Sequence, residues 1–215
     1  MMRWSLCLVF GLAPLAVVAA QGDFALQLET SGDRFIATGV LFPQSGSHVD
    51  AARRARPDIS TLVLQYVPGS DDENDYMDAA LKLRQAGFTT IVPADGLVAS
   101  GGTDFFFAGI HRVIEPGACI GVHSWADDGP PAYQASDLPR DHQDHEDFLR
   151  YFAAIGAPAE FYWFTITAAP ADGMHWMSPE EINRFGMSTR PVPASNESAA
   201  ARAERCDARA SGADG

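Results

Sequence analysis

The sequence predicts an α/β fold in which a mostly parallel β-sheet is flanked by helices. Two observations lead to this prediction. First, apolar, β-branched runs such as residues 61–67 (TLVLQYV) are typical of buried parallel strands, and they alternate with segments of helical periodicity. Second, the alternation repeats, and a β-α-β-α-β succession favours parallel strands joined by right-handed crossovers. We expect one domain over residues 21–187, a length that suits a single core.

The first twenty residues have the composition of a secretory signal peptide. Arg3 is their only charge, an apolar run begins at Leu6, and small residues occupy positions 18–20. A glycine and a proline interrupt the apolar run, which argues against a retained membrane span. We therefore expect residues 1–20 to be removed and the protein to be exported, either to a periplasm or out of the cell.

The chain is strongly acidic. Its formal net charge is −13, Lys82 is its single lysine, and loss of Arg3 with the signal peptide makes the charge one unit more negative. Such a surface repels phosphate backbones and anionic lipids. We therefore exclude nucleic acid and membrane-surface binding as primary functions, and expect no membrane contact beyond the signal peptide.

The segments that precede the centre of the chain have clear periodicity and are bounded by turn residues. Those with strand character are residues 24–28, 34–42, 61–67 and 89–93, the first two lying around the turn Ser31-Gly32-Asp33. Those with helical character are residues 47–56, which end before a proline, and residues 71–87, which begin with acids and end at a glycine. The next strand then leads into the stretch around which we expect the site to form.

That central stretch is Pro93–Trp125, predicted as strand, serine turn, apolar helix (residues 102–109), short strand and a strand ending in histidine. Ser100 precedes two glycines, which permit a sharp turn and leave its hydroxyl uncrowded, as a nucleophile requires. His123 follows the apolar run ACIGV, at a strand end where a catalytic base is commonly placed. On these residues alone, a small-residue helix start and an unrelated histidine fit equally well.

After His123 the chain is first loop, then helical again. We expect helices at residues 138–155 and 159–167, and a short helix after Ser178, where Pro179 and Glu181 complete a capping box. His142 and His145 are three residues apart, but the surrounding acids favour a solvated helix face, so we expect no metal.

The two cysteines that remain after cleavage, Cys119 and Cys206, are either a disulfide or two unpaired thiols. Cys206 lies in residues 188–215, which contain almost no large apolar residue. This composition predicts a disordered tail.

Several short motifs, in order, resemble the proteolytic subunit of the Clp protease. They are VPGS at residues 67–70, VASGG at 98–102, AG at 108–109, PGA at 116–118, IGVH at 120–123 and MSPEE at 177–181 followed by Gly186. The chain is similar to exported members of the ClpP/crotonase superfamily over about residues 35–187. The resemblance implies repeated β-β-α units with a mostly parallel sheet flanked by helices, and self-association into trimers or rings, for which residues 159–167 offer an aromatic helix.

The resemblance also assigns site residues. It makes Ser100 the nucleophile and His123 the base that accepts its proton, as serine catalysis requires. Gly101 N–H is one expected oxyanion donor and the N–H of Ser70 or Gly69 is the other. The orienting acid is expected at Asp172, with Asp127 and Asp128 as rivals.

The function expected from these residues is a serine hydrolase, a peptidase acting on a peptide or a small ester or amide, without a cofactor. The alternative is a non-catalytic envelope scaffold or binding protein with the same fold. An α/β-hydrolase elbow is disfavoured because Val98 replaces its first glycine, and a Ser–Lys dyad because Lys82 lies on a solvated helix. Acyl-CoA chemistry is disfavoured because export separates the protein from CoA.

Overall fold

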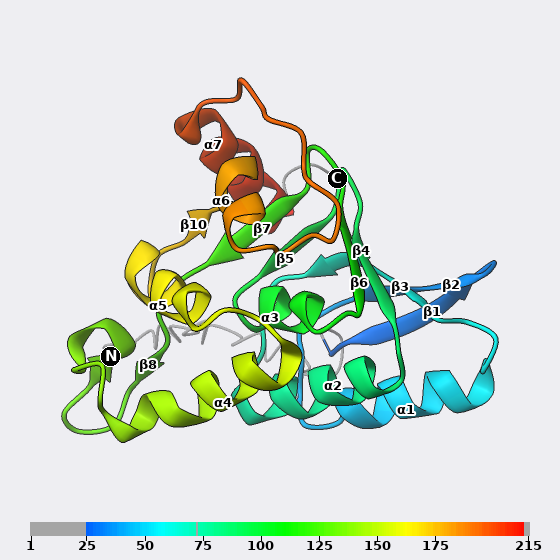
Figure 1. Ribbon diagram of the computed structural model, residues 1–215, viewed down its shortest axis with the longest axis horizontal. Coiled ribbons are helices and arrows are strands. Elements are labelled where there is room, and N and C mark those ends of the chain that lie inside the picture. Colours follow the sequence, from blue (N-terminus) through cyan, green and yellow to red (C-terminus); the bar gives the residue numbers. More distant parts are fainter. Residues whose placement is uncertain (1–24, 72, 213–215) are drawn as a thin grey trace, which may run out of the picture.

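The computed structural model describes residues 25–71 and 73–212 of the chain, so the expected signal peptide, residues 1–20, lies outside the described residues. Within them, the main sheet contains eight strands in the order β1-β2-β3-β5-β7-β10, while β4 pairs with β3 and β6 (Figure 1). Its strands are β1 (Gln27–Ser31), β2 (Arg34–Thr38), β3 (Thr61–Val67), β4 (Thr89–Val92), β5 (Leu97–Ala99), β6 (His111–Ile114), β7 (Cys119–Val122) and β10 (His175–Trp176). A separate two-stranded ribbon joins β8 (Ala126–Asp127) to β9 (Tyr133–Gln134).

The predicted mostly parallel sheet is confirmed. The pairs β2–β3, β3–β4, β3–β5, β4–β6 and β5–β7 are parallel. Two pairs of the described sheet are antiparallel: the β1–β2 hairpin and β7 with the short β10. Helices lie on both sides of this sheet, as the sequence predicts.

The sheet divides at β3, and this division creates the repeated β-β-α units. Residues 61–63 of β3 pair with β4, whereas Tyr66 and Val67 pair with β5. A turn at Pro93–Gly96 separates β4 from β5, and a turn at Glu115–Ala118 separates β6 from β7. Each turn contains a proline, which cannot donate a hydrogen bond to a neighbouring strand. The strands therefore change partners at these two turns. The carboxyl ends of β3, β5 and β7 therefore lie side by side at one edge.

Seven α-helices are described. They are α1 (Ser45–Ala55), α2 (Glu73–Gln85), α3 (Gly101–Phe107), α4 (Glu146–Ile155), α5 (Ala159–Ala168), α6 (Pro179–Arg184) and α7 (Ala199–Ala210). Figure 1 shows α1, α2 and α4 in a row along one side of the sheet, with α6 and α7 on the other. The three consecutive phenylalanines of α3, residues 105–107, are almost completely buried between these layers, as their sequence predicts.

The long helix expected at residues 138–155 is shorter than predicted. Leu138 and His142 have extended backbones, with ψ of 143° and 138°, and α4 begins only at Glu146. Leu138 precedes Pro139, and a residue before proline is driven out of the helical region. The capping box before α6 is confirmed: Ser178 Oγ accepts from Glu181 N, and a carboxylate oxygen of Glu181 accepts from Ser178 N.

The prediction of a disordered tail at residues 188–215 was wrong for the described residues 188–212. Helix α7 is docked on the sheet, and a disulfide joins Cys206 to Cys119 at the start of β7. Polar anchors replace the missing apolar residues: Trp176 Nε1 donates to Asp207 at 2.7 Å, and Arg202 Nε donates to the Trp176 carbonyl at 3.0 Å. Around the disulfide a second, small core forms from Leu97, Ala99 and Trp176.

Candidate active site

Ser100 occupies a sharp turn between β5 and α3, and its backbone is strained. Its φ of 52° and ψ of −133° place a non-glycine residue in a region that L-amino acids rarely adopt. The turn is held from outside, because Ser100 N–H donates to the Gly121 carbonyl on β7 at 3.1 Å. A serine lifted out at a strained strand-to-helix turn is the arrangement that exposes a nucleophilic hydroxyl.

The two glycines after Ser100 are required by close packing. A Cβ on Gly101 would collide with the hydroxyl of Ser70, and a Cβ on Gly102 would collide with the carbonyl oxygen of Val67. The start of α3 therefore lies directly against the end of β3. Because the first N–H groups of a helix have no partner within the helix, this end presents backbone donors beside Ser100.

Gly69 and Ser70, the other expected oxyanion donors, lie across from Ser100. A Cβ built on Gly69 would be 3.7 Å from the Ser100 Cβ. The segment is fixed by hydrogen bonds with Leu41, whose N–H donates to the Gly69 carbonyl at 3.0 Å and whose carbonyl accepts from Asp71 N at 2.9 Å. The structure thus brings Gly69, Ser70 and Gly101 together around Ser100, while their role as oxyanion donors stays a prediction.

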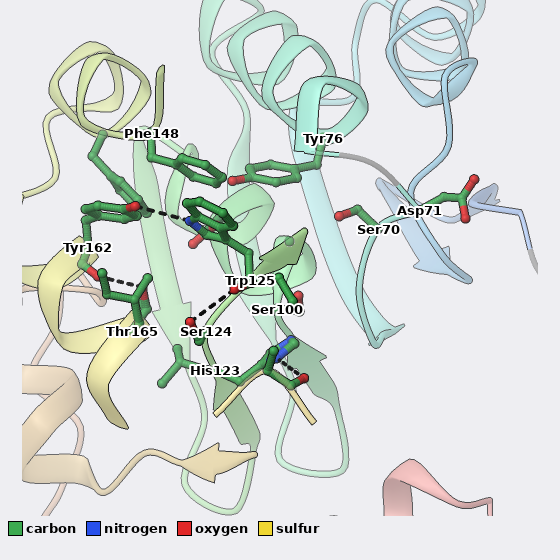
Figure 2. Close-up of a pocket in the computed structure, with 17 residues that line it drawn as sticks. Ser70, Asp71, Tyr76, Ser100, His123, Ser124, Trp125, Phe148, Tyr162 and Thr165 are labelled. Atoms are coloured by element: carbon green, nitrogen blue, oxygen red, sulfur yellow. Dashed lines mark hydrogen bonds between the residues drawn. The ribbon is translucent and has the colours of Figure 1, made fainter. Parts of the chain in front are cut away.

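His123 directly follows β7 and lines the same cavity as Ser100 (Figure 2). Its Nδ1 lies 2.9 Å from the Ala171 carbonyl oxygen. A carbonyl can only accept, so Nδ1 carries the proton and Nε2 keeps a lone pair. Burial lowers the pKa of the imidazole below its ordinary value, although hydrogen bonds to the backbone of Ala171 and Ser124 oppose this shift. The ring is therefore neutral at pH 7, the form that a general base requires.

Within the described residues, Ser100 Oγ and His123 are not joined by a hydrogen bond. The two side chains share a cavity without being paired. Catalytic contacts are commonly longer in a structure without substrate, so this geometry is compatible with a nucleophile and base that close on binding. Their catalytic roles stay a prediction.

Asp172 does not orient His123 in this structure. Asp172 is exposed, and the carbonyl of its neighbour Ala171 occupies the position at Nδ1. The rivals are no better placed. Asp127 accepts from Gly129 N at 2.7 Å, and Asp127, Asp128 and Asp172 line a separate hollow in the surface. Every residue type has a backbone carbonyl, so the sequence could not reveal that Ala171 is the partner of His123.

The cavity has a volume of about 230 Å³, and aromatic side chains form part of its wall. Trp125 and Phe148 are stacked with their ring centroids 5.4 Å apart, and Phe148 stacks on Tyr162 at the same distance. Trp125 Nε1 also donates to the Tyr162 hydroxyl at 3.1 Å. Figure 2 shows these three rings on one side of Ser100, with Ser70 and Asp71 on the other.

Two polar residues of the cavity were not singled out from the sequence. Asp104, one turn of α3 beyond Ser100, lines the cavity and lies near Tyr76 of α2. Burial raises the pKa of the Asp104 carboxyl to about 7, and the nearby Tyr76 hydroxyl acts in the opposite direction. The available signal was its position, since Asp104 is the single acid in the otherwise apolar helix GGTDFFF.

The paired histidines expected on a solvated face are in different environments. His142 is partly exposed beside Asp144, whereas His145 is completely buried and its Nδ1 lies 2.6 Å from the Tyr162 hydroxyl. Across residues 25–71 and 73–212 we find no group of three or more histidine, cysteine or acidic residues placed to hold a metal ion. Nor does any helix in these residues combine the length and apolar character needed to cross a membrane.

Neither a protein-family model nor a curated protein matches the sequence. Among solved structures, it is similar to a variant of the 1510-N membrane-bound stomatin-specific protease in complex with a substrate peptide, with 17% identity, a TM-score of 0.49, and coverage of 76% of this chain and 74% of the other. An enoyl-CoA hydratase from Polaromonas sp. JS666 has 14% identity and a TM-score of 0.48, with 86% and 77% covered. For a putative enoyl-CoA hydratase from Streptomyces coelicolor A3(2) the values are 14%, 0.44, 93% and 78%.

These neighbours are proteins of the ClpP/crotonase superfamily, the one that the sequence motifs resemble. The identities are far below 25% and each TM-score is below 0.5. The activities of these proteins are therefore not transferred to this chain.

Proposed function

We propose that the protein is a serine hydrolase, a peptidase, that forms an acyl-enzyme at Ser100. The observation that carries this proposal is the backbone of Ser100, a strained turn at the carboxyl end of β5 that opens into a cavity shared with His123. Strain of this kind costs about 1 to 3 kcal/mol and persists where the surrounding structure holds it in place. Here it exposes a hydroxyl beside a neutral imidazole.

The proposed reaction has two steps. Ser100 Oγ attacks the carbonyl carbon of an amide or ester while its proton moves to His123 Nε2, which returns the proton to the departing amine or alcohol. Water then attacks the ester on Ser100 while His123 accepts its proton, and His123 passes that proton to Ser100 Oγ as the acid is released. In both steps the negative oxygen is stabilised by the N–H groups of Gly101 and of Ser70 or Gly69. The Ala171 carbonyl holds the His123 imidazole in the tautomer that these two steps require, with the proton on Nδ1.

The test is covalent labelling by a fluorophosphonate, which traps an activated serine. We expect the folded wild type to be labelled and Ser100→Ala to remain unlabelled. Ser70→Ala is the matched control, because Ser70 is a second serine of the same cavity; it should keep its label. If the folded wild type resists labelling, the proposal is wrong.

The second candidate is a non-catalytic scaffold or binding protein, as the sequence also allows. Two observations favour it: Ser100 and His123 are not hydrogen-bonded to each other, and His123 is held by a carbonyl where catalytic triads have a carboxylate. This candidate predicts no labelling in either form, with unchanged thermal unfolding in Ser100→Ala.

We also propose that the protein is exported. The composition of residues 1–20 supports this, and so does the disulfide between Cys119 and Cys206, since such bonds persist mainly in oxidising compartments. The intact mass of the protein from the cell envelope, or from the medium, should correspond to a chain without its first twenty residues. A full-length cytoplasmic product would contradict this.

Self-association into a trimer or ring is a further proposal, for which α5 is the expected interface. Phe161 and Tyr162 of this helix are buried within the chain, whereas Trp163 and Phe164 remain partly accessible. Light scattering would decide it, and a monomeric mass would exclude it.

A further inference from the structure

Asp104 is a partly buried acid that the proposed mechanism does not use. It lies in the cavity wall, and its Tyr76 neighbour lines the same cavity. Within residues 25–71 and 73–212, no ion pair involves Asp104. A carboxylate has about four sites that accept hydrogen bonds, and the single hydroxyl of Tyr76 can fill at most one of them, so acceptor capacity remains for a group that enters the cavity.

The aromatic rings around Asp104 limit which kind of ligand group could pair with its carboxylate. Trp125, Phe148 and Tyr162 form one wall, and Tyr76 stands beside the carboxyl. Aromatic faces attract cations as well as apolar groups, and more strongly when water is excluded. A purely apolar group would fill the space but leave the acid without a new partner, which is costly in a buried site.

Size and position also fit a long side chain with a charged end. The cavity of about 230 Å³ is larger than the roughly 150 Å³ in which benzene is known to bind, and smaller than the roughly 300 to 1,000 Å³ of most small-molecule sites. Asp104 lies four residues, or about 6 Å of helix, beyond Ser100. One substrate side chain could therefore reach Asp104 while its backbone remains at Ser100.

We propose that this cavity binds a basic side chain, that of lysine or a similar alkylammonium group, and that Asp104 is the residue that determines this specificity. The inference rests on the proposed hydrolase function and names its substrate class: peptides, esters or amides with a basic group on the acyl side of the bond that is cleaved. The negative charge of the chain adds to this preference by attracting cationic substrates.

Preference for the basic group should depend on pH in a defined direction. The pKa of the Asp104 carboxyl is raised to about 7 by burial, so the acid is largely protonated below that pH and ionised above it. The titratable groups near it are Tyr76 from α2, Tyr151 from α4 and Tyr162 from α5, and the cavity also contains His123 and Asp71. Burial raises the pKa values of Tyr151 and Tyr162, so both stay neutral near pH 7. Burial lowers the pKa of His123 below its ordinary value, so the imidazole is neutral over most of this pH range and does not distinguish a charged from an uncharged probe.

The experiment compares two peptidyl diphenyl phosphonates that differ only in carrying a lysine or a norleucine side chain next to the phosphorus. We expect the lysine probe to label Ser100 at least tenfold faster in the wild type, with a ratio that rises between pH 6 and pH 8. Asp104→Asn should reduce the ratio to about one, because the lysine probe loses its ionic partner. Asp71→Asn, which removes a carboxyl from the other side of the cavity, is the matched control and should keep the lysine preference.

An equal or faster rate with the norleucine probe, or an unchanged ratio in Asp104→Asn, would overturn the specificity while leaving the hydrolase intact. If neither probe nor the fluorophosphonate labels the folded protein, the proposed function fails instead. Calorimetry with n-butylammonium and n-butanol then tests the cavity alone in Ser100→Ala. Binding of the amine that is lost in Ser100→Ala/Asp104→Asn supports the basic site, and equal binding of amine and alcohol refutes it.

Discussion

The two ends of strands β5 and β7 differ: the carboxyl ends carry the candidate site, and the amino ends are attached to α7. Their carboxyl ends carry Ser100 and His123, with a strained backbone and a partly buried acid nearby, features that lower stability. Their amino ends are held by α7 through the Cys119–Cys206 disulfide and through Arg209, which donates to the Gly96 carbonyl at 2.9 Å. A strained site is maintained when its surroundings fix it firmly. We infer that α7 fixes the strands that carry the strained turn at Ser100.

Loss of the disulfide tests this comparison most severely. Cys206→Ser removes the disulfide between residues 87 positions apart, so the unfolded chain gains much conformational freedom. We expect the free energy of unfolding to fall by about 2 to 5 kcal/mol, measured by urea denaturation. Such a change is a large fraction of the roughly 5 to 15 kcal/mol that stabilises a typical domain.

The control for this prediction is the partner cysteine. Cys119→Ser should cost about as much as Cys206→Ser, and the double variant should cost little more, because both changes remove one bond. Two unequal losses that simply add would show that the cysteines act independently, and α7 would not be the anchor described here.

The site end of these strands could be predicted from the sequence because its signals are local. The turn at Ser100 needs adjacent glycines, and His123 follows an apolar run, so both appear as patterns of a few residues. The α7 end could not be predicted, because composition was a poor guide. Its helix is attached by arginines that reach backbone carbonyls, as when Arg205 donates to the Gly117 carbonyl, and by a disulfide between distant residues.

Two details of the site were hidden for related reasons. The partner of His123 is the backbone carbonyl of Ala171, which any residue type would offer, and the sequence led to the adjacent Asp172 instead. Asp104 was passed over as part of an apolar helix, since its chemistry depends on Tyr76 and the aromatic rings that α2, α4 and α5 bring to it. Fold class follows from periodicity, whereas these contacts require the tertiary structure.

A smaller change sharpens the comparison at the α7 end. The Trp176 indole, which is 6% exposed, donates to the Asp207 carboxylate at 2.7 Å. Asp207→Ala leaves that buried N–H without its acceptor, and we expect a loss of about 1 to 3 kcal/mol in the free energy of unfolding. Asp207→Asn keeps an acceptor oxygen of the same shape and should lose clearly less. Equal losses in both variants would mean that the charge, not the hydrogen bond, holds the helix.

The smallest expected effect has the opposite sign and lies at the site end. Ser100→Gly removes the Cβ that makes a φ of 52° unfavourable, at the expense of a more flexible unfolded chain. These terms leave a net gain of about 1 kcal/mol in the free energy of unfolding, with complete loss of labelling. Ser100→Ala also loses the hydroxyl but retains the Cβ, so it should show no such gain. The difference between the two variants in urea denaturation isolates the strain. If glycine proves no more stable than alanine, the turn is not strained, and the contrast between a costly site and a stabilising anchor is lost at this residue.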